Sequence, residues 1–458
     1  MNSFLMRWPE ADPAALKWFR EIAVTHLWLP WDAPGNTQAF LQACRAASIA
    51  VIAEFPPDGR AQLALARKAG FDGAAFTAEG DEKALAALVN QHSDWQLFAL
   101  LDPARIHWRT GAARAVLAAG LWPGARRLDP AAAGATQQAW LDANAYLIAC
   151  LRGLFASRDA WLGYRADERA GVSKTQPPPY GSVEVALAEA VMAGGGLVLT
   201  LPEHYRQALL RGKETAHAAW RSLLQTARFL REHRSGFLRP FGARVAVVAG
   251  SLPDCAEIVN LLYRHNVSPA VAPTNAIPAY GRFRILVAVG LGPHPAAARA
   301  VLTFARAGGK VLAVPVGPDE PAWWRQAAPT RIRSEENRDF FALGQGLLIA
   351  YREPVEDPGE LALDVIDAMG WRTRDLRIWG STTVLGILHR LDGGRLSVEL
   401  LSYGGPARDF LLRVEGRFQR ATLRRPGAPA LPLRAAMRGT GTEVEISRLE
   451  RVASLLLE

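Results

Sequence analysis

The first 236 residues alternate short apolar runs with amphipathic stretches of helical spacing. The apolar runs, which are strand candidates, cover residues 4–9, 24–31, 49–55, 73–77, 95–101, 120–126, 160–165 and 196–201. The helix candidates cover residues 12–22, 37–47, 60–69, 82–91, 111–119, 137–155, 183–192 and 214–231. Eight such units predict a (β/α)8 TIM barrel, because crossover helices force parallel strands and eight tilted strands close on themselves. An open doubly wound sheet stays the alternative, since the count includes the short first run.

The next block of the chain contains apolar runs without alternation. They cover residues 244–250, 268–273, 282–290 and 310–317, and helical stretches at 253–265 and 295–307 separate them. Strands that are buried on both faces have this pattern, so the block predicts a small open parallel sheet. Residues 346–352 predict one more strand, and residues 358–369 predict a returning helix.

From residue 376 the apolar positions change to a period of two. The strand candidates here cover residues 383–388, 396–403, 409–414, 417–423 and 443–446, with turns rich in Gly and Pro between them. Five or six short strands at close spacing predict a small antiparallel β-sandwich. The three patterns together predict a barrel domain at 1–238, an α/β domain at 239–355, and a linker helix with the sandwich at 356–458.

Composition and charge narrow the class of protein. The chain has 458 residues, of which 50% are hydrophobic and 21% are charged, as expected for a globular protein with buried cores. The net charge of +9 is spread along the chain without a block of like charges, so we expect neither a nucleic-acid nor a membrane partner. The start of the chain lacks the pattern of a secretory signal, which favours a cytoplasmic protein, although a signal peptide that has been removed would leave no trace.

The cysteines and glycines exclude several kinds of site. Cys44, Cys150 and Cys255 lie far apart and lack metal-ligand spacing, so no metal and no disulfide framework is expected. The turn after residues 282–289 has no Cys, which excludes glutaminase chemistry at that position. The turn at Gly250 lacks a GxGxxG pattern, so nucleotide binding is unsupported and no cofactor is expected.

Active sites of (β/α)8 barrels lie at the carboxyl ends of the strands. Acidic residues stand there at Asp32, Glu54, Glu79, Asp102, Asp129, Asp167 with Glu168, and Glu203 beside His204. Aromatic residues stand at the same places: Trp8, Trp28, Trp31, Phe55, Trp122, Tyr164, Tyr180 and Tyr205. Carboxylates among flat apolar rings suit a sugar, which suggests a carbohydrate substrate. An acidic residue before Pro is also an ordinary turn former, as at Asp102 and Asp129.

Two carboxyl groups that face each other can hydrolyse a glycoside, one as the proton donor and the other ionised. Strand ends that carry many acids can supply such a pair. A metal-dependent hydrolase is disfavoured, because no paired His residues stand at the strand ends.

The order of the three predicted domains resembles that of glycoside hydrolase family 42 β-galactosidases. Residues 282–316 are similar to the flavodoxin-like middle domain of that family, which looks like a class I amidotransferase, and residues 396–414 are similar to its sandwich strands. The resemblance implies a divergent multidomain glycosidase, active on a small glycoside or oligosaccharide. It also implies a homo-oligomer that forms through the middle domain.

The resemblance further implies roles for individual residues. In that family the acid/base follows strand four and the nucleophile follows strand seven, which correspond here to Glu79 and to Glu168, with Asp167 as the substitute. Two departures are visible: Ala78 stands where the family has Asn, and strand seven is followed by Asp-Glu instead of a single Glu. The residues expected to bind substrate are Trp8, Trp31, Asp32, Glu54, Asp102, Trp122, Asp129, Tyr164, Glu203 and His204. The alternative is a non-catalytic carbohydrate-binding or scaffold protein on a degenerate barrel.

Overall fold

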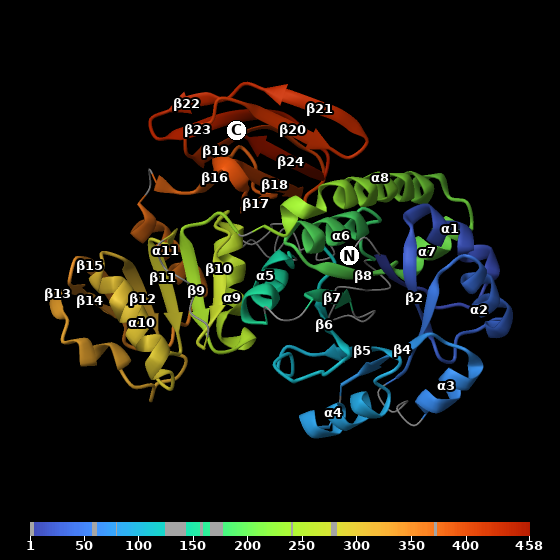
Figure 1. The fold of residues 1–458 in the computed structure, drawn as a ribbon. Helices are drawn as coiled ribbons and strands as arrows, with labels where there is room; N and C mark the ends of the chain where they lie inside the picture. The colour runs from blue at the N-terminus through green and yellow to red at the C-terminus, as the bar shows by residue number, and fades with distance from the viewer. Residues whose placement is uncertain are drawn as a thin grey trace, which may run out of the picture. The chain divides into compact units, whose positions relative to one another are not determined.

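The computed structural model describes residues 4–56, 62–78, 80–123, 143–155, 159–164, 177–239, 241–275, 282–370 and 373–458. The chain forms two compact units (Figure 1). The first unit comprises Met1–Asn144 with Ser157–Arg234, and the second comprises Ala145–Ala156 with Ser235–Glu458. The second unit therefore holds both the α/β sheet and the antiparallel sheets, and the boundary near residue 355 stays a prediction.

A closed barrel of eight parallel strands forms the first unit, which confirms the barrel over the open sheet. The strands are β1 (Phe4–Arg7), β2 (Val24–Pro30), β3 (Ala50–Glu54), β4 (Gly73–Thr77), β5 (Gln96–Leu101), β6 (Arg114–Gly120), β7 (Trp161–Tyr164) and β8 (Gly196–Thr200). Each strand contributes one buried residue to a single core cluster: Leu5, Trp28, Ile52, Ala75, Phe98, Val116, Trp161 and Val198. Large rings and a small Ala therefore fill the barrel interior together.

The sixth strand corrects the sequence prediction. Residues 111–119 were expected to be a helix and residues 120–126 a strand, but β6 begins at Arg114 and pairs with β5 and β7. The Ala-rich sequence has helical propensity, yet Val116 and Leu117 are fully buried in the barrel wall. Tertiary burial outweighs local propensity here. Residues 102–113 contain no helix, so the β5–β6 crossover consists of turns.

The helices of the first unit follow the strands much as predicted. They are α1 (Leu16–Ile22), α2 (Thr37–Ala46), α3 (Leu63–Ala69), α4 (Glu82–Gln91), α6 (Ser182–Met192), α7 (Glu203–Leu210) and α8 (Glu214–Phe237), whose last residues belong to the second unit. Side chains cap two of them: Asn36 accepts from the Ala39 N–H at 3.1 Å, and Asp81 accepts from the Ala84 N–H at 2.7 Å. The short α7, which begins at Glu203, was not predicted.

The second unit contains a seven-stranded sheet in the order β10-β9-β11-β12-β15-β14-β13. These strands are β9 (Val245–Ala249), β10 (Ala270–Pro273), β11 (Ile285–Val289), β12 (Lys310–Val314), β13 (Thr330–Ser334), β14 (Arg338–Leu343) and β15 (Gly346–Tyr351). The first five in that order run parallel in the 2-1-3-4-5 sequence of doubly wound sheets. Strands β13 and β14, which were not predicted, extend the sheet in antiparallel fashion.

Helices cover both faces of this sheet. They are α9 (Leu252–Arg264), α10 (Pro295–Arg306) and α11 (Pro358–Met369). Helix α10 shares a core cluster with Ala246 and Val248 of β9, whereas the alternate residues of β9 face the other side. Helix α11 contacts α9 and β11.

One helix of the second unit comes from within the barrel sequence. Helix α5 (Ala145–Leu154) lies between β6 and β7 in the chain, but it contacts α9 and β10. Gly153 permits this approach, because a Cβ at this residue would lie 2.3 Å from the Val271 carbonyl oxygen. Arg152 on the same helix donates to the Leu238 carbonyl at 3.1 Å, and its guanidinium lies 4.9 Å from the ring centre of Phe241.

Two antiparallel sheets complete the second unit, in the orders β16-β19-β23-β22 and β17-β18-β24-β20-β21. Their strands are β16 (Leu376–Trp379), β17 (Val384–Arg390), β18 (Leu396–Ser402), β19 (Ala407–Glu415), β20 (Ala421–Arg425), β21 (Ala428–Leu433), β22 (Ala436–Arg438), β23 (Gly441–Leu449) and β24 (Val452–Leu457). One core cluster contains buried residues from both sheets, and their assignment as a β-sandwich stays a prediction. The prediction of five or six strands missed β16, β21, β22 and β24. Strands β21 and β22 are largely exposed and lack a buried face to reveal them, whereas β24 is a fully buried apolar run that the period-two search did not include.

Buried polar contacts link the α/β sheet to these antiparallel sheets. The Arg244 guanidinium donates to Asp375 at 2.6 Å, and both side chains are largely buried. Asn266 accepts from the Gly386 N–H at 2.8 Å, and Ser268 accepts from the Leu388 N–H at 3.3 Å. These contacts explain why the two parts form one compact unit. In the described part of the chain, no helix is long and apolar enough to cross a membrane.

Candidate active site

The carboxyl ends of the eight strands meet at one face of the barrel, where the sequence placed the candidate site. Glu79, Asp129, Asp167 and Glu168 lie outside the described residues. The strands that precede them are described: β4 ends at Thr77, two positions before Glu79, and β7 ends at Tyr164, three positions before Asp167. The barrel topology therefore supplies the strand ends that the predicted pair requires.

An ion pair lies in the mouth of the barrel between two alternate strands. Arg7 ends β1 and Glu54 ends β3, each two residues beyond an interior core residue, Leu5 and Ile52 respectively. The period of two along a strand directs both side chains inward. The Arg7 Nε donates to Glu54 Oε2 at 2.6 Å, with 29% and 17% of the two side chains exposed. A partly buried cation and carboxylate thus lie at the carboxyl face of the barrel.

Asp102 shapes the turn after β5. Its Oδ1 accepts from the Arg105 N–H at 3.0 Å, and the Arg105 guanidinium lies 3.6 Å from Oδ2. The same guanidinium donates to the Ala78 carbonyl at 2.9 Å. Ala78 itself is buried and donates its N–H to the Leu100 carbonyl at 2.8 Å. Arg105 therefore ties the turn after β5 to the residue that directly precedes Glu79.

Tyr164 and Trp122 stack on each other with ring centres 4.4 Å apart. Trp122 is 2% exposed, and the Tyr164 hydroxyl donates to Glu189 of α6 at 3.2 Å. The fully buried Glu189 also accepts from the Asn144 side-chain amide at 2.6 Å. Burial, together with the charge of Glu189 and the hydrogen bond to it, raises the pKa of Tyr164 well above its usual value of 10. This network holds the ends of β6 and β7 against α6, and it leaves Trp122 little surface for a ligand.

A buried arginine organises the residues that follow β8. Arg206, whose side chain is 4% exposed, lies 2.8 Å from Glu10 and 2.6 Å from Glu203. Its guanidinium lies 5.7 Å from the ring centre of Trp8, which is 1% exposed and packs edge-on against Phe19. Partial burial opposes ionisation of Glu203, but the hydrogen bonds from Arg206 and Gln207 and the charge of Arg206 lower its pKa.

The remaining candidates divide into two groups. His204 and Tyr205 both stack on Tyr180, with ring centres 5.4 Å and 4.6 Å away, and burial lowers the pKa of His204. Trp31 stacks on Phe55 with ring centres 5.6 Å apart. At the end of β2, Trp31 stays partly exposed and the neighbouring Asp32 is exposed. Trp31 and Asp32 thus retain surface that a ligand can reach.

Sequence reasoning missed the residues that organise this face: Arg7, Glu10, Arg105, Glu189 and Arg206. The pattern of carboxylates and aromatic rings after each strand does not reveal the cations that pair with them. The period of two along the first strand could have identified Arg7, because Arg7 follows Leu5 on the same face. Among the described residues, no group of three or more His, Cys, Asp and Glu could hold a metal ion.

The barrel with its added sheets has the fold of multidomain glycoside hydrolases. The α-L-fucosidase isoenzyme 2 from Paenibacillus thiaminolyticus aligns over 100% of both chains with a TM-score of 0.61 and 10% identity. A β-galactosidase from Rahnella sp. R3 covers 97% of this chain and 98% of its own, with a TM-score of 0.57 and 10% identity. A β-galactosidase from the psychrophilic Marinomonas ef1 covers 99% of each chain, with the same TM-score and identity.

These likenesses show the fold and support a glycosidase-like architecture. No family model matches the sequence, and no curated protein matches it. Because the identity to the solved structures is only 10%, membership of family 42 stays a prediction.

Proposed function

We propose that the protein is a glycoside hydrolase whose active site lies at the carboxyl face of the barrel. Glu79 is the acid/base, Glu168 is the nucleophile with Asp167 as its substitute, and the reaction retains the anomeric configuration. The substrate is a small glycoside or oligosaccharide. The observation that carries the proposal is the closed barrel of glycosidase fold, in which β4 and β7 end just before these carboxylates.

The barrel topology supports the choice of strands. Strands β4 and β7 are three steps apart in a ring of eight, so their carboxyl ends lie on different sides of the barrel mouth. A retaining glycosidase needs its two carboxyl groups about 5–5.5 Å apart on opposite sides of the scissile bond. Two adjacent strands would bring their first loop residues too close together to hold a sugar between them.

The described residues at the carboxyl ends of the barrel strands are consistent with a polar substrate. Arg7 and Glu54 offer a donor and an acceptor for hydroxyl groups, and Trp31 offers a partly exposed ring beside them. In the proposed mechanism, Glu168 attacks the anomeric carbon while the glycosidic C–O bond breaks, and the protonated Glu79 donates its proton to the departing oxygen, so the aglycone leaves as an alcohol. Water then hydrolyses the glycosyl-enzyme ester, and Glu79 accepts the proton from that water.

Hydrolysis of a panel of aryl glycosides tests the proposal. Glu79→Gln and Glu168→Gln should each lower kcat by about 10²–10⁴, whereas Glu232→Gln, at an exposed position of α8, should leave kcat unchanged. Proton NMR of the first product should show the configuration of the substrate. If Asp167→Asn is the inactive variant and Glu168→Gln is active, the nucleophile is Asp167.

The same panel separates the proposal from its alternative. A wild-type protein that hydrolyses none of the glycosides but binds a sugar in calorimetry would favour the carbohydrate-binding barrel. A product of inverted configuration would contradict the retaining mechanism, but it would still support the proposal that the protein is a glycoside hydrolase.

A further inference from the structure

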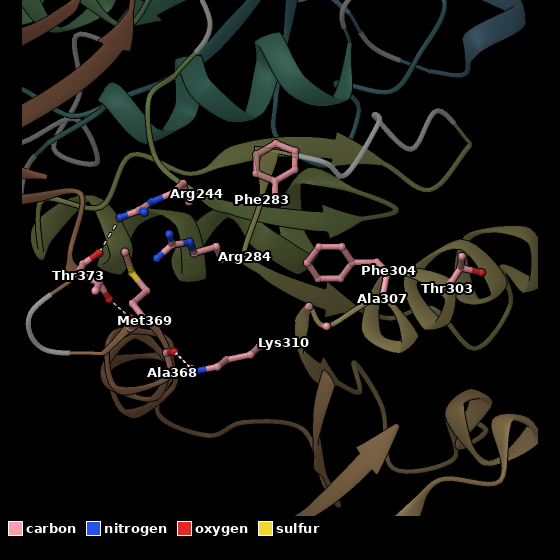
Figure 2. Close-up of a pocket in the computed structure, with 12 residues that line it drawn as sticks. Arg244, Phe283, Arg284, Thr303, Phe304, Ala307, Lys310, Ala368, Met369 and Thr373 are labelled. Atoms are coloured by element: carbon pink, nitrogen blue, oxygen red, sulfur yellow. Dashed lines mark hydrogen bonds between the residues drawn. The ribbon is translucent and has the colours of Figure 1, made fainter. Parts of the chain in front are cut away.

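A cavity of about 620 Å³ lies at the amino-terminal edge of the seven-stranded sheet (Figure 2). Ligands of doubly wound sheets usually bind at the opposite, carboxyl edge, so this cavity is separate from that location. The residues before β9 and β11, the first residue of β12, and the last turns of α10 and α11 form its walls. The lining residues that carry the argument are Arg244, Phe283, Arg284, Phe304, Lys310 and Met369.

Three cations line the cavity, and the described lining residues include no carboxylate. Strand register brings the cations together: Ile285 pairs with Val245 on one side and with Lys310 on the other. Arg284 donates its backbone N–H to the Arg244 carbonyl at 2.8 Å, and it accepts from the Lys310 N–H at 3.0 Å. Neighbouring strands are about 4.8 Å apart, so the three cationic residues stand side by side at the starts of adjacent strands.

Two of these cations have structural partners. Arg244 pairs with Asp375 at 2.6 Å and donates to the Thr373 carbonyl at 2.8 Å. The Lys310 ammonium donates to the Ala368 carbonyl at 2.6 Å, where it satisfies the carboxyl end of α11. A role in folding accounts for both of these side chains.

The third cation has no such role. Within the described residues, no carboxylate and no hydrogen-bond acceptor contacts the exposed Arg284 guanidinium. Figure 2 shows its side chain directed into the cavity, between those of Arg244 and Lys310. An arginine with a planar fork of donors, beside a second cation, suits a carboxylate or phosphate group.

Apolar surface adjoins these charges. Phe283 and Phe304 are largely buried and line the cavity together with Met369. Gly309 lets the Phe304 ring lie at this edge, because a Cβ on Gly309 would stand 2.2 Å from the ring. A cavity of this size falls in the range of about 300–1,000 Å³ that small-molecule sites occupy.

We propose that this cavity binds a small organic anion. Its phosphate or carboxylate group pairs with Arg284 and Lys310, and its apolar body lies against Phe283 and Phe304. The site belongs to the second unit and is independent of the chemistry proposed for the barrel.

Calorimetric titration with phenyl phosphate tests the proposal, with inorganic phosphate and phenol as comparison ligands. Wild type should bind phenyl phosphate more tightly than either part alone. Arg284→Gln should weaken binding about tenfold or more, because a charge-assisted hydrogen bond is lost. Arg299→Gln removes the same charge from an exposed position of α10 outside the cavity, and it should bind like wild type.

Benzoate in place of phenyl phosphate shows whether the carboxylate or the phosphate is preferred, and tighter binding of either one supports the site. Circular dichroism confirms that Arg284→Gln folds. The proposal is overturned if neither anion binds at millimolar concentration, or if Arg284→Gln binds as tightly as wild type. It is also overturned if inorganic phosphate binds as well as phenyl phosphate.

Discussion

Arg7 and Glu54 pair at 2.6 Å across the mouth of the barrel, although β2 lies between their strands. The pair is possible because side chains from alternate strands share a layer of a barrel interior. The layer beneath is wholly apolar. The ion pair therefore marks the level at which the apolar core of the barrel gives way to polar side chains.

Removal of Arg7 should destabilise the barrel. In Arg7→Met the largely buried Glu54 carboxylate loses its cation, which we expect to lower the free energy of unfolding by about 1–3 kcal/mol. Urea unfolding monitored by tryptophan fluorescence measures the change. Arg67→Met is the matched control, because its ion pair with Asp94 is exposed, and no measurable change is expected. An equal loss of unfolding free energy in Arg7→Met and Arg67→Met would contradict a larger contribution from the Arg7–Glu54 ion pair.

Arg105 should act as a positioning residue for the proposed hydrolysis. It donates to the Ala78 carbonyl at 2.9 Å, so its loss should allow the segment before Glu79 to shift. Arg105→Met should lower kcat roughly ten- to a hundredfold with little change in KM, as misplaced catalytic groups do. It should also displace the acidic limb of the pH profile of kcat, a result that a purely structural role would not give. The exposed Arg109→Met is the control and should keep wild-type values.

Glu399 should make stability depend on pH. It is fully buried on β18, Ser397 donates to its Oε1, and within the described residues its Oε2 has no hydrogen-bond partner. Burial raises its pKa from 4.5 to about 7, although the hydrogen bonds from Ser397 and Ser454 and the charge of Arg424 oppose the shift. The folded state therefore holds the proton more tightly than the unfolded state. This stabilisation is complete below pH 4.5 and is lost as the pH rises to about 7.

Replacing Glu399 by Gln, which does not titrate, should remove its contribution to the pH dependence of the unfolding free energy. Between pH 4.5 and 7 the Glu399 carboxyl should contribute on the order of 3 kcal/mol to the fall in stability of wild type. Glu399→Gln should lack this part of the fall and should be the more stable protein at pH 8. The exposed Glu445→Gln should keep the wild-type dependence. Urea midpoints across the pH range give the comparison, and a wild-type slope in Glu399→Gln would contradict the assignment.

The three cysteines should be unreactive in the native protein. All are buried, and burial and the charge of Asp72 raise the pKa of Cys44 to about 12. Burial and the neighbouring Cys255 thiol raise the pKa of Cys150 well above its usual value. At pH 8 the Cys44 thiolate fraction is therefore about one ten-thousandth.

Labelling with a disulfide reagent measures thiol reactivity. Native wild type should show no fast-reacting thiol at pH 8, and unfolding in urea should expose three. Ser447→Cys, at an exposed position of β23, should add one fast thiol and thus verify the assay. Rapid labelling of native wild type would show that one of the helices opens.

The sequence predicted most of the parallel strands that are buried on both faces, but it missed the fully buried β24. Strands β9, β11 and β12 are continuous apolar runs in the sequence. In the barrel, stretches with the helical period of apolar residues separate the strands, so strands and helices can be told apart. The prediction was wrong at β6, where an Ala-rich segment is a strand because its neighbours β5 and β7 bury it. Such burial is a property of the closed barrel, and a local window of sequence does not contain it.

The candidate site was less predictable for a related reason. The position after a strand says which residues reach the face of the barrel, but it does not say which of them are already paired. Trp8 and Trp122 occupy predicted positions, yet their rings are covered by Phe19 and Tyr164. Arg206 forms an ion pair with Glu203, one helical turn away. It forms a second ion pair with Glu10, which is distant in the sequence. Contacts of this kind depend on side-chain packing between segments that the sequence separates.

Helix α5 packs in the second unit although it lies within the barrel part of the sequence, which affects folding during synthesis. The ribosome makes this helix roughly a hundred residues before α9, its packing partner, so the helix must wait in the growing chain for its partner to emerge. No single peptide bond can be cut to release both units intact, because a cut after residue 238 separates α5 from α9 and β10. The barrel segment and the α/β segment of the chain therefore cannot be exchanged with those of another protein at a single junction. An exchange that preserves both units must also include the segment that encodes α5.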